Sequence, residues 1–255
     1  MEKIFDSHAH YDDERFDEDR QQVLEALRQD VCAVINCASD LESARCSLDL
    51  AEKYDYIYAA VGIHPHEAAQ LPADWLGQVE KLAGEEKAVA IGEIGLDYHY
   101  DFCPRDIQKQ VFAAQVELAK KLNLPIIVHD REAHGDMYEI LRKYAPLAGV
   151  VHCFSGSAEL ARETVSMGMH IGLGGAVTFK NARVPLEVAQ FVPMERLLLE
   201  TDAPYMAPVP FRGKRCDSSH IRITAEKIAQ VKGVTTDELI ARARENAEKL
   251  FLGKK

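Results

Sequence analysis

Short hydrophobic runs rich in strand-forming residues alternate with longer amphipathic stretches along the whole chain. Eight of these runs have the length and composition of buried strands. They are expected at residues 3–10, 31–38, 57–63, 88–94, 125–130, 149–153, 170–174 and 197–202. Marker residues at their ends, from His10 to Asp202, recur at intervals of 22 to 36 residues. A strand, a helix and two loops need about that much chain.

Eight strand and helix units predict an α/β chain folded as a (β/α)8 TIM barrel. The alternative is a doubly wound sheet, which usually has a glycine-rich turn after its first strand. Here that turn carries Asp12, Asp13 and Glu14. The barrel is therefore the favoured fold.

Two helices stand out in the amphipathic stretches. Residues 104–122 begin at Pro104, place apolar side chains along one stripe, and end before Asn123 and Pro125. Residues 236–251 follow Thr235-x-x-Glu238, which has the pattern of a capping box. This last stretch is expected to be an additional C-terminal helix outside the barrel, with a structural role only.

Length and composition set the outer limits. The 255 residues are 28% charged and 47% hydrophobic, so they can bury a full core. Barrels of roughly 250 residues fold as one domain, and no change of composition divides the chain. Residues 1–255 are therefore expected to form a single domain.

The chain also has features of a cytoplasmic protein. It has no stretch resembling a signal peptide and no apolar run of membrane length, so we expect no membrane association. Its six cysteines include no Cys-x-x-Cys pair and are expected to be reduced thiols. We expect a cytoplasmic monomer with no obligatory protein partner.

The net charge limits the type of nucleic-acid contact. The net charge of −11 argues against a large binding surface for nucleic acid, because non-specific affinity for duplex comes from cationic surface that neutralises phosphates. Any binding of phosphate must therefore be local.

Candidate chemistry gathers where the expected strands end. His8 and His10 lie two apart on an extended segment, so both rings project from one face. Four later side chains also stand at strand ends: Glu93, His129, His152 and Asp202. In a barrel of this type, the carboxyl ends of the strands meet at one mouth. A single buried histidine is more often a hydrogen-bonded core residue than a ligand. Metal-capable side chains at the ends of five strands are much less expected by chance.

This set of side chains favours two divalent cations. Four ligands saturate one tetrahedral ion, so five or six converging ligands indicate a second one. Mixed imidazole and carboxylate ligands suit Zn²⁺ or Mn²⁺ better than an all-oxygen Mg²⁺ site, although the identity stays open among Mg, Mn and Zn. Glu93 is the natural bridge between ions about 4 Å apart. In a regular strand, Ile91, Glu93 and Gly95 would share one face.

Many ordered motifs resemble those of one family, the TatD-type metal-dependent deoxyribonucleases of the amidohydrolase-like barrel superfamily. The motifs are Asp6-Ser7-His8-Ala9-His10, Gly62-Ile63-His64-Pro65-His66, Gly92-Glu93-Ile94-Gly95-Leu96-Asp97, Leu124-Pro125-Ile126-Ile127-Val128-His129, Arg131-Glu132-Ala133, His152-Cys153-Phe154-Ser155-Gly156, Glu200-Thr201-Asp202-Ala203-Pro204-Tyr205 and Arg212-Gly213-Lys214-Arg215. The chain departs from the family at Cys216-Asp217-Ser218, where Asn-Glu-Pro is usual. That loop is expected to overhang the mouth and to alter substrate contacts.

The resemblance implies a division of the ligands. His8, His10, Glu93 and Asp202 would bind one metal, and Glu93, His129 and His152 the other. The catalytic residues would be Asp202 and Glu93. A water activated by the metals would attack the phosphorus of a terminal phosphodiester, with Asp202 orienting that water and receiving its proton.

Several side chains near the mouth are candidates for substrate contacts. Arg131 and the cluster of Arg212, Lys214 and Arg215 are expected to hold flanking phosphates, although a solvated loop is nearly as good an account of the cluster. His64 belongs to a second His-x-His in which Pro65 interrupts regular pairing, so it fits a substrate-contacting loop better than a third metal site. Three aromatic rings are candidates for stacking on a base: Tyr98, His99 and Tyr205.

Two functions compete at this stage. The first is a DNA exonuclease that acts on single-stranded or frayed ends, with nucleic acid as its substrate. The second is a metal-dependent amide or ester hydrolase, such as a deacylase, because the same arrangement of metals attacks carbonyl groups. The arginine and lysine residues near the mouth favour the phosphodiester.

Overall fold

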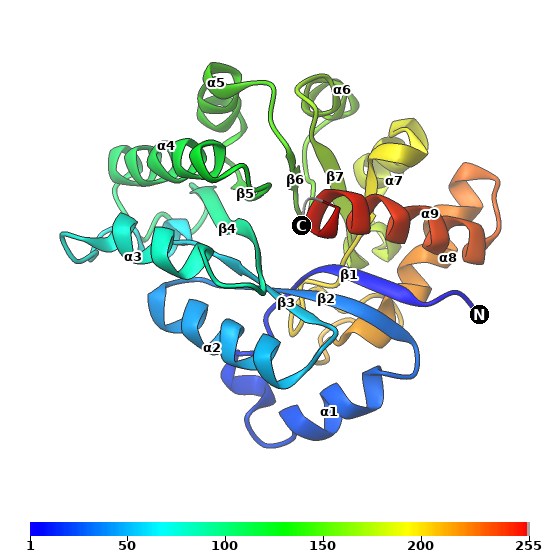
Figure 1. Ribbon diagram of the computed structural model, residues 1–255. Helices are drawn as coiled ribbons and strands as arrows, with labels where there is room; N and C mark the ends of the chain where they lie inside the picture. The colour runs from blue at the N-terminus through cyan, green and yellow to red at the C-terminus, as the bar shows by residue number, and fades with distance from the viewer. Residues whose placement is uncertain (254–255) are drawn as a thin grey trace.

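The computed structural model describes residues 1–253; residues 254 and 255, the end of the expected single domain, lie outside the described residues. Eight strands form one parallel sheet in which neighbours along the chain are neighbours in space (Figure 1). The strands are β1 (Ile4–Ala9), β2 (Val31–Cys37), β3 (Ile57–Val61), β4 (Ala88–Asp97), β5 (Ile126–Arg131), β6 (Gly149–Val151), β7 (His170–Leu173) and β8 (Leu197–Leu199). The expected (β/α)8 barrel is confirmed.

Each of the eight predicted runs overlaps one strand, but the ends differ. β4 continues to Asp97, three residues beyond the predicted end, because it pairs with β5 up to Arg131. β6 and β8 have only three residues each. His152 and Asp202 consequently follow their strands instead of ending them.

Nine α-helices are found in the described residues, and most of them form the outer layer of the barrel (Figure 1). They are α1 (Arg20–Leu27), α2 (Leu41–Lys53), α3 (Trp75–Ala83), α4 (Arg105–Leu122), α5 (His134–Tyr144), α6 (Ala158–Ser166), α7 (Arg183–Phe191), α8 (Ile221–Lys232) and α9 (Thr236–Ala247). The prediction for residues 104–122 is confirmed by α4, which ends where Asn123 adopts a left-handed conformation. None of the helices within residues 1–253 is long and apolar enough to cross a membrane.

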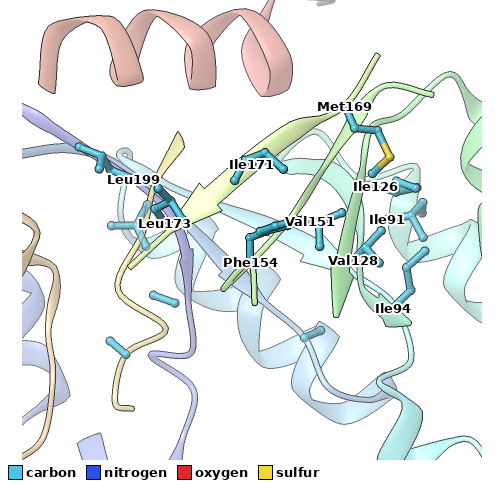
Figure 2. Packing of buried hydrophobic residues seen from close by; sticks show 14 of the residues in the cluster. Ile91, Ile94, Ile126, Val128, Val151, Phe154, Met169, Ile171, Leu173 and Leu199 are labelled. Carbon is cyan, nitrogen blue, oxygen red and sulfur yellow. The ribbon is translucent and has the colours of Figure 1, made fainter. Parts of the chain in front are cut away.

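The main apolar core lies between the strands and the outer helices. Figure 2 shows Ile91 and Ile94 of β4 beside Ile126 and Val128 of β5 within this core. Along β5, Ile127 points to the opposite side and shares its face with His129, since side chains alternate along a strand. Ile127 therefore belongs to the inside of the barrel, below the mouth.

The C-terminal helix closes the other end of the barrel. Thr235 caps α9 by accepting a hydrogen bond from the amide of Glu238 at 3.2 Å. After α9, a π-helical turn (Glu248–Leu252) brings Leu250 and Phe251 into contact with the inner cluster, where the ring of Phe251 stacks on Phe5 at 6.3 Å. Figure 1 shows α9, in red, lying across the ring of strands. The additional helix is thus confirmed, and its structural role is to cover the amino-terminal opening.

The first and last strands meet at the carboxyl end of the barrel. The amide of Asp202 donates to the carbonyl of His8 at 2.9 Å, and the amide of His10 donates to the carbonyl of Ala203 at 2.6 Å. The hydroxyl of Ser7 donates to the carbonyl of Leu199 at 3.0 Å. This seam holds the segment that carries His8 and His10 against the segment that carries Asp202.

We predict that His170, in β7, makes stability depend on pH. Burial, reinforced by the charge of Arg196, lowers the pKa of its ring from 6.5 to about 4. Between pH 6.5 and pH 4 the unfolded chain therefore binds a proton that the folded chain does not, so folding stability falls as the pH falls through this window. The loss reaches about 3 kcal/mol at pH 4.

Urea denaturation of the wild type and of His170→Gln at pH 7.5 and pH 4.5 measures this effect. Glutamine does not titrate, so the difference in unfolding free energy between the two proteins should move in favour of the variant at the lower pH. An equal difference at both pH values would rule out the role of His170.

Candidate metal centre and its cavity

The six side chains expected to bind metal lie together at the carboxyl end of the barrel. His8 belongs to β1, Glu93 to β4 and His129 to β5, whereas His10, His152 and Asp202 stand in the loops directly after β1, β6 and β8. The short strands β6 and β8 and the seam between β1 and β8 determine how far these loops reach into the mouth.

Glu93 reaches this position through an irregularity of β4. Ile91 pairs with Ile126 and Ile94 with Val128, so β4 advances three residues where β5 advances two. Such a bulge redirects the side chains that follow it. Ile91 and Ile94 both point into the outer core, which makes the expected regular alternation of Ile91, Glu93 and Gly95 wrong.

Four side chains form the first group of donors. The Nε2 atoms of His8 and His10 are 3.0 Å apart, and they lie 3.3 and 3.5 Å from Oε2 of Glu93. Asp202 Oδ1 lies 3.6 Å from the first ring and 3.4 Å from the second. Donor atoms this close to one another can bind a single ion.

The other oxygen of Glu93 faces a second group. Its Oε1 lies 2.7 Å from Nδ1 of His129 and 2.8 Å from Nε2 of His152. These two ring nitrogens are 3.3 Å apart. Glu93 therefore contacts both groups, one through each oxygen.

His64 lies closer to this centre than its loop position indicated. Its Nε2 is 3.7 Å from Oε1 of Glu93, and its ring packs edge-on against His129 at 4.6 Å. His64, Glu93 and His129 form one of three groups of donors that could hold a metal ion. The ring is thus placed to contact either an ion or a group bound to it.

The protonation of the centre shows how strongly it attracts positive charge. Burial acts to lower the pKa of His10, but the hydrogen bond to Asp202 and the charge of Glu93 raise it to about 10. In the same way Asp97 and Glu93 outweigh burial and raise the pKa of His129 to about 9. These carboxylates therefore stabilise two extra protons.

The same centre also offers neutral nitrogen donors. Burial, with a further contribution from the charge of His152, lowers the pKa of His8 to about 4, so this ring is neutral at pH 7. Burial acts to raise the pKa of Glu93, but His152 and His8 hold it well below its usual range. Neutral imidazole and ionised carboxylate are the metal-binding forms, and a divalent cation would displace the protons on the other rings. The residues present fit divalent cations.

Neighbouring groups fix the orientation of the rings. Cys37 contacts both rings of the first group. Its carbonyl oxygen lies 2.8 Å from Nδ1 of His10, and its thiol Sγ lies 3.3 Å from Nδ1 of His8. On the other side, Asp97 Oδ2 lies 3.2 Å from Nε2 of His129. Such outer partners set the tautomer and direction of a metal-binding ring.

Two buried carboxyl groups near the centre were not predicted to act there. Asp97 is 1% exposed and also lies 2.9 Å from Nε2 of His66. Glu200 accepts a hydrogen bond from the amide of Cys153 and lies 3.9 Å from Nδ1 of His152, a nitrogen atom with no hydrogen-bond partner in the described part of the chain. Asp97 stands two residues after Gly95, and Glu200 stands two residues before Asp202. This spacing alone does not reveal which side chains the two carboxyl groups face.

A cavity of about 780 Å³ opens above the centre. Its wall includes Glu93, His129, His152 and Asp202, and four cationic side chains lie on it: Arg15, Arg131, Arg212 and Lys214. None of the four forms an ion pair with a carboxylate among residues 1–253. The predicted positions of His64, Arg131 and Arg212 at the mouth thus agree with the geometry.

Other rim residues differ from the expectation. Arg215 is paired with Asp19 at 2.6 Å and does not line the cavity, so the expected basic cluster is reduced to Arg212 and Lys214. Tyr98 donates a hydrogen bond to Asp136, and His99 pairs with Glu132. Both rings lie off the cavity wall.

The unusual loop at 216–218 does not overhang the mouth. Cys216 and Ser218 are 1% and 0% exposed, and neither lines the cavity. The hydroxyl of Ser218 donates to Asp6 Oδ2 at 2.7 Å and bonds to the hydroxyl of Tyr11. The departure from the family pattern therefore alters the support beneath the seam rather than substrate contacts.

The chain is similar to known proteins along nearly its whole length. A family model described as TatD related DNase matches residues 5–252. An uncharacterized metal-dependent hydrolase of Bacillus subtilis, YabD, is 45% identical over 97% of this chain and 98% of its own. A protein of Pantoea ananatis named 3'-5' ssDNA/RNA exonuclease TatD is 32% identical over 97% of this chain and 99% of its own. The crystal structure of YjjV, a TatD homologue of Escherichia coli K12, superposes with a TM-score of 0.91 at 33% identity, covering 98% of each chain.

We predict that the close approach of Glu200 to Gly172 makes this glycine intolerant of substitution. A Cβ atom at Gly172 would lie 2.3 Å from Glu200 Oε2 and 3.1 Å from the Cα atom of His152. Gly172→Ala should therefore lower the unfolding free energy by about 1–3 kcal/mol. Gly77→Ala is the matched control in α3, where nothing lies within 4 Å of the added atom.

Urea denaturation at pH 7.5 compares the two variants. The control should gain about 0.5–1 kcal/mol, since alanine favours a helix over glycine. Equal stability of Gly172→Ala and the wild type would show that Glu200 is free to move.

Proposed function

The chain belongs to the TatD related DNase family, and from this premise we propose that it is a metal-dependent hydrolase that cleaves phosphodiester bonds of DNA. We propose that it acts as an exonuclease on single-stranded or frayed ends. One observation carries the proposal: a carboxylate shared by two groups of metal donors lies below a cavity whose rim carries cations that have no ion pair within residues 1–253.

The proposed ligands follow the two groups. His8, His10, Glu93 and Asp202 would hold one divalent cation, and Glu93, His129 and His152 the other. Ions of Mg, Mn or Zn would supply Lewis-acid chemistry, lowering the pKa of water and neutralising charge on the phosphoryl group. Glu93 would have a catalytic role because each of its two oxygens faces one of the two groups of donors.

Asp202 is the proposed acceptor of the proton of the attacking water. Its side chain is 18% exposed and lines the cavity, whereas that of Glu93 is 4% exposed. Burial acts to raise the pKa of Asp202, but His10 and His152 lower it, so the carboxylate is ionised at neutral pH. It can therefore orient a water at the floor of the cavity and receive its proton.

Substrate contacts would come from the rim. Arg131 and Arg212 carry guanidinium groups without a carboxylate partner in the described part of the chain, and guanidinium binds phosphate oxygens in a bidentate way. His64 would contact the phosphoryl group beside Glu93. A small cationic rim on a chain of net charge −11 supports a preference for short or single-stranded ends. The name of the Pantoea relative, a 3'-5' ssDNA/RNA exonuclease, supports the same class of substrate.

Digestion of end-labelled oligonucleotides tests the proposed function. With Mg²⁺, Mn²⁺ or Zn²⁺ added, single-stranded DNA should give a ladder of terminal products faster than blunt duplex. A bis-aryl phosphodiester should be hydrolysed in preference to an aryl ester. Turnover of the ester alone would replace the nuclease with a carbonyl hydrolase.

Asp202→Asn should lower the turnover number at least about 100-fold, because the water loses its proton acceptor. Its circular dichroism and melting temperature should stay close to those of the wild type. Glu67→Gln is the matched control, since it removes one exposed negative charge from the same cavity wall. Comparable turnover of Asp202→Asn and Glu67→Gln would remove Asp202 from the reaction.

Metal content tests the shared carboxylate. After chelation and reloading, elemental analysis should give two divalent ions per wild-type chain. His10→Ala and His129→Ala should each retain one ion, and Glu93→Ala should retain none. Two ions in His129→Ala would contradict the division into two groups.

A further inference from the structure

Two aromatic rings stand exposed on the wall of the cavity. Tyr100 and Phe102 belong to the loop between β4 and α4, and they are 49% and 68% exposed. Their rings stack on each other, with centroids 5.3 Å apart and an angle of 27° between the planes. Adjacent rings left open to water on a functional cavity are typical of a binding surface.

Cationic and polar groups of the same wall surround this pair. The guanidinium of Arg131 lies over the ring of Tyr100 at 4.7 Å. The ring of His66 meets Tyr100 edge-on at 5.4 Å and Phe102 at 4.9 Å. All four side chains line the 780 Å³ cavity. A flat apolar surface thus lies beside a cation that has no carboxylate partner in residues 1–253.

The pair is joined to the metal centre by a short series of contacts. His66 lies 2.9 Å from Asp97 Oδ2, and the same oxygen lies 3.2 Å from His129. The aromatic pair is therefore separated from a donor of the second group by His66 and Asp97 only. A group bound at the centre and a group stacked on the pair would be neighbouring parts of one ligand.

Phe102 offers the more accessible surface of the two rings. Besides the main cavity, it lines a neighbouring hollow of about 420 Å³, and together with His66 and Glu67 it separates the two. Tyr205, on the opposite rim, is a poorer platform. Its hydroxyl donates to Asp13, and its ring is 40% exposed, less than either ring of the pair.

We propose that Tyr100 and Phe102 form a stacking subsite for a nucleobase of a single-stranded nucleic acid, next to the bond that is cleaved. The subsite rests on the proposed function and specifies which form of nucleic acid the cavity takes. Stacking accepts any base, since every base has a π face. In a duplex the neighbouring pairs cover these faces, so the subsite selects unpaired ends. Arg131 holds the phosphate beside the stacked base.

Calorimetric titration with unlabelled oligonucleotides tests the subsite. The titrations use Asp202→Asn protein loaded with metal, so that the probe is not digested. One probe is oligothymidylate, and the other has the same backbone with abasic residues at both ends. Tyr100→Ala with Phe102→Ala should weaken binding of the thymidylate about tenfold, within the range for loss of base stacking. Binding of the abasic probe should change less than twofold.

Two control variants separate stacking from general damage. Tyr100→Phe with Phe102→Tyr keeps both rings and should bind like the parent. Phe211→Ala removes an exposed ring that does not line the cavity and should also leave binding unchanged. Equal weakening of both probes by the double alanine variant, or no weakening of either, would overturn the subsite.

The two proposals fail in different ways. The subsite alone is wrong if the wild type digests oligonucleotides and the double alanine variant still binds the thymidylate more tightly than the abasic probe by the same factor as its parent does. If the wild type neither binds nor digests any oligonucleotide, the nuclease proposal is wrong and the subsite falls with it.

Discussion

The buried carboxylate of Asp6 holds together the seam on which the centre depends. It accepts hydrogen bonds from the amide of Thr201 at 3.1 Å and from the hydroxyls of Thr201 and Ser218 at 2.6 and 2.7 Å. It also accepts one from the amide of His8 at 3.2 Å. These bonds tie the segment that carries His8 to the segment that carries Asp202, two parts of the first donor group almost 200 residues apart in sequence. A buried carboxylate is stable only with such partners, so the seam has one geometry.

Glu93 extends this fixed geometry to the second group. Its side chain is almost inaccessible to water and is surrounded by imidazoles. A buried anion needs compensating positive charge, which protons or metal ions can supply. The high pKa of His10 and of His129 has the same origin. The affinity of the centre for cations is therefore a consequence of burying carboxylates among imidazoles.

The sequence predicted the barrel and the meeting of six side chains because both depend on periodicity. Parallel strands of a closed barrel bring their carboxyl ends to one rim, so residues such as His129 can be placed from the hydrophobic pattern. Contacts that depend on local geometry could not be predicted. The bulge in β4 changes which side chains accompany Glu93, and the loop after β4 turns Tyr100 rather than Tyr98 into the cavity. The partners of Asp97 and Arg215 are set by three-dimensional proximity, which spacing does not encode.

The distribution of charge explains why a local site suits an acidic chain. At physiological ionic strength, exposed charges act over about 8 Å, so the rim cations Arg131 and Arg212 attract phosphate only near the mouth. The rest of the surface, with a net charge of −11 for the chain, repels a long polyanion. Under the proposed function, a flexible end would enter the cavity while the remainder stays in solvent, whereas a rigid duplex would bring more of its phosphates close to the acidic chain. Under the proposed function, the same charges would therefore weaken binding of duplex and favour a substrate presented by its end.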